Sequence, residues 1–160
     1  MKKGYLVKAF NETIVSVTGQ MFNFKSLQFR EQQQIRVFPN EKVVACKLCD
    51  NESIEGYFYM GVGNKACTCL LEPYVDYQQD NCEHDMLLNS LLEEYVNNIL
   101  GHFTVSPKMV EEYGCLSFSV PWIENHPKKV SAAQPLGVLS CGDGVDLKFL
   151  MTLELVTVPG

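Results

Sequence analysis

Six residues with side chains that bind zinc lie within one short stretch of the sequence: Cys46, Cys49, Cys67, Cys69, Cys82 and His84. The two-residue gap between Cys46 and Cys49 is typical of a turn that brings two sulfur atoms to one ion. Cys67 and Cys69 are expected on a strand, where residues two apart point to the same side. A tetrahedral site would combine Cys46 and Cys49 with one of Cys67 or Cys69 and with either Cys82 or His84. We predict no cofactor, and a bound zinc ion is the alternative.

The same cysteines also fit the interior of a sheet. Cys46 follows Val43-Val44-Ala45, and Cys67 and Cys69 are bracketed by Ala66 and Leu70-Leu71. Free cysteine is among the most buried residue types, so these surroundings favour core thiols over zinc, with reversible disulfide pairing as a further alternative. The chain has seven cysteines, an odd number, so they cannot all pair within it.

A second constellation lies near the C-terminus. Ser140-Cys141-Gly142-Asp143-Gly144 is similar to the glycine-flanked cysteine of chymotrypsin-like viral proteases. That resemblance implies Cys141 as a nucleophile, with His84, His102 or His126 as its base. A hairpin turn accounts for the same glycines and aspartate without chemistry. We therefore predict no catalytic residue and keep a cysteine hydrolase as an alternative.

Composition and charge limit the classes of function. The 160 residues suit a single domain, 1–160, and no apolar run is long enough for a membrane helix. Lys8, Asn11 and Glu12 interrupt what would be the apolar core of a signal peptide, so we expect a location in the cytoplasm, in a host cytoplasm or in a virion. The net charge is −6, and residues 51–115 carry −9 of charge against +4 in residues 1–50. An acidic body disfavours nucleic acid.

Strands are expected through much of the chain. Residues 5–10 and 13–18 resemble a hairpin, and further strands are expected at 35–38, 42–48, 54–60 and 65–71. Strands also flank Gly142-Asp143-Gly144, and their long hairpin, residues 136–158, is the expected contact element, because an open strand edge can pair with a partner's sheet.

One strong amphipathic helix is predicted from about residue 83 to residue 100. Its apolar stripe contains Leu88, Leu91, Leu92, Tyr95, Val96 and Ile99, and Gly101 is expected to cap its C-terminus. The opposite face, which we interpret as solvated, carries Asn89, Ser90, Glu93, Glu94 and Asn97. A short helix is expected to begin at Ser106-Pro107 and to end at Gly114.

These elements predict an α+β fold, with a mostly antiparallel sheet and with the long helix (about 83–100) and the short helix packed on one face. Because no catalytic set converges, the sequence favours a non-enzymatic protein–protein interaction or assembly subunit of a virus or phage particle or of another multi-subunit complex. Its partner would be another protein or a second copy of itself, with no nucleic acid and no membrane. The alternatives are a small acidic inhibitor of a basic enzyme or effector, a structural-zinc module and a cysteine hydrolase.

Overall fold

The computed structural model describes residues 3–50, 54–74, 81–125, 130, 133–142 and 144–155, without the side chains of 3–6, 54, 81–83, 112–113 and 153–155. The helices are α1 (Lys3–Met21), α2 (Asn64–Leu71), α3 (Asn81–Thr104) and α4 (Pro107–Tyr113). The strands are β1 (Gln28–Arg30), β2 (Lys42–Cys49), β3 (Ile54–Val62), β4 (Ser117–Phe118), β5 (Trp122–Ile123), β6 (Gln134–Ser140) and β7 (Asp146–Leu155).

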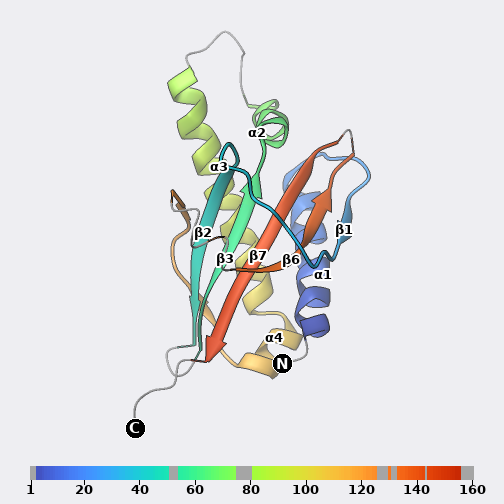
Figure 1. Ribbon diagram of the computed structural model, residues 1–160, viewed down its shortest axis with the longest axis vertical. Helices are drawn as coiled ribbons and strands as arrows, with labels where there is room; N and C mark the ends of the chain where they lie inside the picture. Colours follow the sequence, from blue (N-terminus) through green and yellow to red (C-terminus); the bar gives the residue numbers. More distant parts are fainter. Residues whose placement is uncertain are drawn as a thin grey trace.

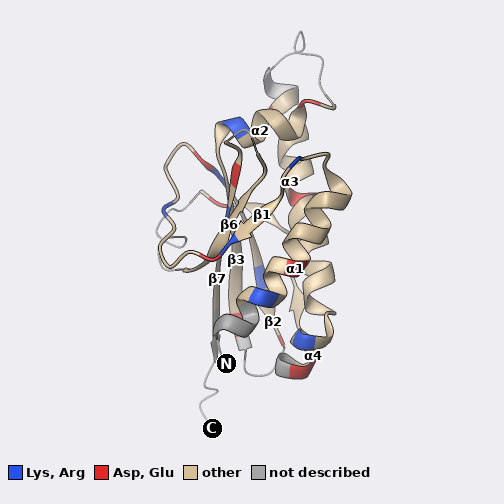
Figure 2. Ribbon diagram, turned by 90° about the vertical axis from the view of Figure 1, so that its right-hand side faces the viewer, with Lys and Arg blue, Asp and Glu red and all other residues tan. Residues whose placement is uncertain are grey.

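The strands form one antiparallel sheet. Among the described residues seven strands pair in the order β1-β6-β7-β3-β2-β4, and β5 pairs with β2 beside β4 (Figure 1). Helices α1 and α3 lie side by side on one face of this sheet, and a long loop crosses the other face (Figure 2). The predicted α+β class, the antiparallel sheet and the helices on one face are confirmed. Within the described residues, no helix combines the length and the apolar character needed to cross a membrane.

The alternation of side chains along the central strands builds two apolar clusters. On β2, Val44, Cys46 and Leu48 face the helices and join the main core. Val43 and Ala45 point to the opposite face, where they pack with Tyr59, Val130, Ala133 and Leu150 in a smaller cluster. Because successive residues of a strand point to opposite faces, a strand covered on both sides needs apolar residues at nearly every position.

The N-terminal hairpin was predicted wrongly, because residues 3–21 form the single helix α1. Its side chains Val7, Phe10, Ile14 and Val17 recur at helical spacing and are buried on the sheet. The β-branched residues that suggested strands are tolerated because burial outweighs local preference. The hydroxyl of Thr18 donates a hydrogen bond to the Ile14 carbonyl oxygen one turn earlier, at 2.6 Å.

Three further predictions are corrected. Residues 65–71 lie in helix α2 and not in a strand, with Ala66 and Leu70 buried. Residues 35–38 are irregular and pair with no strand of the described chain. Helix α3 continues through Gly101 to Thr104, so Gly101 is not its cap. The short helix after Ser106 is confirmed as α4, ending before Gly114.

The C-terminal hairpin is paired with neighbouring strands over most of its length. Strand β7 lies between β6 and β3, and β6 is paired on its other side with β1. Among the described strands, β1 covers β6 at Val138, Leu139 and Ser140, and β6 covers β7 from Asp146 to Met151, so the far end of β7 is paired with β3 alone. These pairings narrow the edge that a partner strand could use, and the hairpin as contact element stays a prediction, with 156–158 outside the described chain.

Candidate functional site

Helix α3 is held rigidly by the side that faces the sheet. The predicted stripe is confirmed, since Leu88, Leu91, Leu92, Tyr95, Val96 and Ile99 are all buried. The Tyr95 hydroxyl forms a hydrogen bond with the hydroxyl of Thr18 on α1, and the Tyr95 ring meets Phe22 edge to face at 5.0 Å. A helix that is fixed in this way can present side chains on its outer face with little freedom of the backbone.

Polar contacts on both flanks of α3 define which residues remain outward. On one flank, the Lys42 ammonium donates a hydrogen bond to the Asn89 side-chain oxygen at 2.6 Å. On the other flank, the Asn98 amide donates to the sulfur of Met21 at 3.2 Å. Between these flanks lie Ser90, Glu94 and Asn97, which are exposed. Their spacing of four and then three residues places them on one face of the helix, and we call this set the α3 polar face.

The α3 polar face combines three kinds of reactive or orienting group. A carboxylate accepts hydrogen bonds and protons, a carboxamide donates and accepts at once, and a hydroxyl does both. Glu94 and Asn97 are three residues apart on the helix, so their side chains are neighbours on its surface. The surface of a single helix is convex, so it cannot enclose a small substrate. This arrangement suits a reaction whose pocket is completed by the surface of a second protein.

The sequence contains the signal for this set on the face that is predicted to be solvated. That signal is the regular spacing of three chemically different groups. The adjacent carboxylates Glu93 and Glu94 do not converge, because neighbouring residues diverge along a helix and Glu93 is half-buried beside the exposed Glu94.

The charged side chains on α3 itself are acidic. The sequence has no lysine or arginine between Lys65 and Lys108, whereas seven acidic residues fall in that interval. Figure 2 shows acidic positions on α3 and no basic ones in the described part of the helix. Lys42, on the neighbouring strand β2, is a cation that contacts α3: its ammonium pairs with Asp85 at 2.6 Å. A partner with a basic surface would therefore be attracted to this side of the molecule.

The structure separates the cysteines proposed for zinc. Cys46 and Cys49 both lie within the continuous strand β2, three residues apart, so there is no turn to direct them to one ion. The Cys46 thiol is buried and donates to the Ser119 carbonyl oxygen at 2.9 Å, and burial raises its pKa. Cys67 and Cys69 lie on α2, where residues two apart diverge, so the same-side argument fails.

His84 lies on α3 with its Nε2 atom buried and without a hydrogen-bond partner among the described residues, and the Cys82 side chain is not described. No group of three or more His, Cys, Asp or Glu that could hold a metal ion occurs among the residues that the structure describes. A zinc site therefore gains no support from the described chain. Where it would need Cys82, the site remains a prediction from sequence.

Cys141 does not have the environment of a nucleophile. It is buried directly after β6, and its backbone N–H bonds to the Val145 carbonyl oxygen at 2.8 Å. Burial raises the pKa of its thiol to about 11, so the thiol is protonated at neutral pH. His102 is exposed near the end of α3, and His126 lies outside the described residues. The glycines that flank Cys141, at 142 and 144, have positive φ, as a hairpin turn requires.

Comparison with solved structures identifies the fold. The chain is similar to a CheX from Borrelia burgdorferi solved in a CheX-CheY-BeF3-Mg2+ complex, with a TM-score of 0.69 and 17% identity over 92% of this chain and 97% of that one. It is also similar to the chemotaxis protein CheX from Vibrio vulnificus (TM-score 0.64, 9% identity, 93% and 99% covered) and to Thermotoga maritima FliY (TM-score 0.53, 14% identity, 92% and 83% covered). This is a CheC-like fold. No family model matches the sequence, and no curated protein matches it.

The fold corrects the function predicted from sequence. The solved chains that share it are named as chemotaxis proteins, among them CheX, a CheC-like protein and FliY, and one was solved in complex with CheY. The prediction of a non-enzymatic assembly subunit is therefore wrong, as are its alternatives of inhibitor, zinc module and cysteine hydrolase, and so is the prediction of no enzymatic activity. Nothing supports a viral origin. The expectation of a protein partner agrees with the CheX that was solved bound to CheY.

Proposed function

We propose that this chain removes the phosphoryl group from a phosphorylated receiver protein of the CheY kind, in a bacterial cytoplasm. The observation that carries the proposal is the likeness, over 92% of this chain, to a CheX held in complex with CheY and BeF3. Beryllium trifluoride is a tetrahedral mimic of a phosphoryl group, so the partner in that complex is in its activated form. The convex α3 polar face supports the proposal, because it needs a second protein to complete a pocket.

The reaction needs a water molecule placed in line with the phosphorus–oxygen bond that breaks. We assign that placement to Asn97, whose carboxamide can accept a hydrogen bond from the water and donate one to a phosphoryl oxygen. Glu94, one turn away, accepts the second water proton in a hydrogen bond and fixes the orientation of the water. The water oxygen bonds to phosphorus, the bond to the receiver oxygen breaks, and inorganic phosphate leaves. Positioning of this kind, with stabilisation of charge, accounts for most of phosphoryl-transfer catalysis.

The test is release of phosphate from CheY-type receiver proteins of the same genome, phosphorylated with a small phosphodonor. The chain is expected to accelerate the loss of phosphate from at least one of them. Asn97→Ala and Glu94→Ala are each expected to slow it by about 100-fold, the size of effect of a positioned hydrogen-bonding group. Glu31→Ala is the matched control, because Glu31 is also an exposed carboxylate but follows β1 at the opposite end of the sheet.

A second measurement separates chemistry from docking. Both variants are expected to keep most of their affinity for the receiver in its BeF3-bound form, because each removes one small exposed group. The association rate is expected to fall as salt is added, since the α3 side of this chain is acidic. Unchanged phosphate release in both variants would refute the assignment of these residues. Failure of every activated receiver to bind would refute the proposed function itself.

A further inference from the structure

A large cavity lies on the other side of the molecule from the main core. Its volume is about 1030 Å³, at the upper end of the range for small-molecule sites. Its apolar lining includes Val43, Val130 and Leu150, which belong to the smaller cluster on the face of the sheet opposite α1 and α3. The walls are the loop 35–41, residues 123–125, and the flank of α3 at Asp85 and Asn89. None of the α3 polar face lines it.

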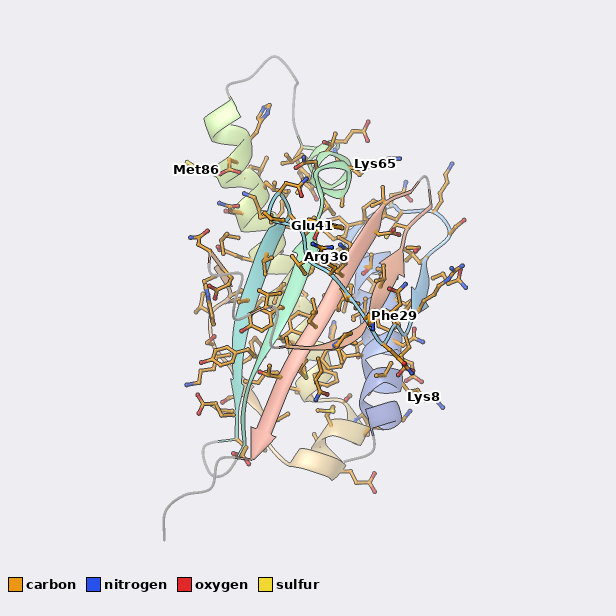
Figure 3. All side chains as sticks on the ribbon, viewed as in Figure 1. Lys8, Phe29, Arg36, Glu41, Lys65 and Met86 are labelled. Carbon is orange, nitrogen blue, oxygen red and sulfur yellow. The ribbon has the colours of Figure 1, made fainter. Side chains whose placement is uncertain are left out.

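The loop that forms one wall is fastened in place. The Lys148 ammonium of β7 pairs with the Glu41 carboxylate at 2.8 Å and donates a hydrogen bond to the Arg36 carbonyl oxygen. The same Glu41 carboxylate accepts the Phe38 backbone N–H at 2.7 Å. Figure 3 shows Arg36 and Glu41 in front of the sheet, on the side away from α1 and α3. These contacts keep the cavity open without a ligand, so binding would require little reorganisation.

The carboxylates that line the cavity already have donors. Glu41 has Lys148, Asp85 has the Lys42 ammonium at 2.6 Å, and the buried Glu124 accepts the indole N–H of Trp122 at 3.1 Å. These acidic groups therefore have little remaining capacity to attract a cation.

The cavity is also lined by side chains that can donate hydrogen bonds to a ligand. The Arg36 side chain is exposed, its guanidinium lies 5.6 Å from the centre of the Phe38 ring, and it forms no ion pair with any described residue. The side-chain amides of Asn40 and Asn125 line the same space. A free guanidinium offers a planar pair of donors that matches a carboxylate. Glu41 and Glu124 nearby would repel a doubly charged phosphate more strongly than a singly charged carboxylate.

We infer that this cavity binds a small organic monocarboxylate with an apolar body, the carboxylate held by Arg36 and the body resting on Val43 and Leu150. The inference does not depend on the proposed phosphatase activity. An apolar lining gains affinity for each methylene that it removes from water, and a single charged group at the rim fixes the orientation of the ligand.

The experiment titrates the whole chain with hexanoate, octanoate and decanoate, and follows heat release and backbone amide shifts. Saturable binding is expected, with affinity rising several-fold per methylene and with shifts at Val43, Leu150 and the loop 35–41. Octanamide has the same apolar body without the charge, and it is expected to bind the parent chain about tenfold more weakly than octanoate does. Octanoate is likewise expected to bind the variant Arg36→Gln about tenfold more weakly than the parent chain, the effect of losing one charge-assisted hydrogen bond.

The matched control is Arg30→Gln on β1, which removes an exposed arginine far along the sheet from the cavity and should leave octanoate affinity unchanged. The inference is overturned if the series shows no saturable binding, or if the shifts lie outside the cavity. It is equally overturned if octanoate binds Arg36→Gln as tightly as the parent chain, since the apolar lining alone would then account for the affinity.

Discussion

The contact between Lys148 and Glu41 gives a quantitative test of how the face of the sheet opposite α1 and α3 is organised. The two side chains are only 16% and 10% exposed, and their charged atoms lie 2.8 Å apart. The Lys148 ammonium also lies 4.4 Å from the centre of the Phe38 ring. Lys148→Met keeps the length of the side chain but leaves the Glu41 carboxylate with one backbone donor. Breaking such a buried pair from one side is expected to cost about 3 kcal/mol of unfolding free energy.

Glu41→Gln should cost less, about 1 kcal/mol, because the amide oxygen can still accept the Phe38 N–H. The double variant removes both charges, so the two costs should not add, and the coupling is expected to be about 1–2 kcal/mol. Urea unfolding followed by the fluorescence of Trp122, the only tryptophan of the chain, measures all three variants. Trp122 packs against the smaller cluster and so reports on this face.

The control pair is Lys47 and Glu55, which have the same 2.8 Å separation but are 44% and 41% exposed. Lys47→Met should change stability far less than Lys148→Met, because solvent screens an exposed pair. If the two lysine variants are equally stable, or if the Lys148 and Glu41 effects simply add, then the ion pair between Lys148 and Glu41 does not hold the loop 35–41 against the sheet.

Three other outcomes are expected. Phe10→Ala, in the middle of α1, should cost about 3–5 kcal/mol in urea unfolding, because Phe10 is fully buried; a cost under about 1 kcal/mol would contradict the packing of α1. Gly137→Ala should cost about 1–3 kcal/mol and weaken the hydrogen-exchange protection of β1, since the added carbon would lie 2.5 Å from the Arg30 carbonyl oxygen. Thiol labelling at pH 8 should modify the exposed Cys115 far faster than Cys141, whose pKa is raised to about 11. Because the thiol of the unfolded chain, with a pKa of about 8.5, releases its proton before the buried Cys141 thiol does, the free energy of unfolding should fall as pH rises above that value. A Cys141→Ser chain should lose less unfolding free energy between about pH 8 and 11.

The N-terminal segment shows where local sequence failed. Residues 5–18 are rich in β-branched residues, and their apolar positions also fit an alternating pattern. The same segment places Val7, Phe10, Ile14 and Val17 on one side of a helix. Only the presence of a sheet face that those side chains can cover decides between the two patterns, because burial of the whole stripe is worth more than the propensities.

Sheet strands and the long helix were easier to predict. Strands β2 and β3 have strong apolar runs with clear ends, and α3 has an uninterrupted stripe at helical spacing. Helix α2 was missed because it is short and its residues Cys67, Thr68 and Cys69 have little helical preference. Its formation depends on packing of Ala66 and Leu70 into the main core.

The candidate site divides in the same way. The helix that carries Ser90, Glu94 and Asn97 could be predicted from sequence, since hydrophobic periodicity is a local property that every amphipathic helix must have. The acidic character of that region could be read in the same way. Sequence could not show that neighbours close the flanks beside Asn89 and Asn98 while the three other groups stay exposed, because those contacts form only in the folded chain. Whether a polar helix face is solvent-covered surface or a site depends on what packs around it, and those contacts are made by residues far away in the chain.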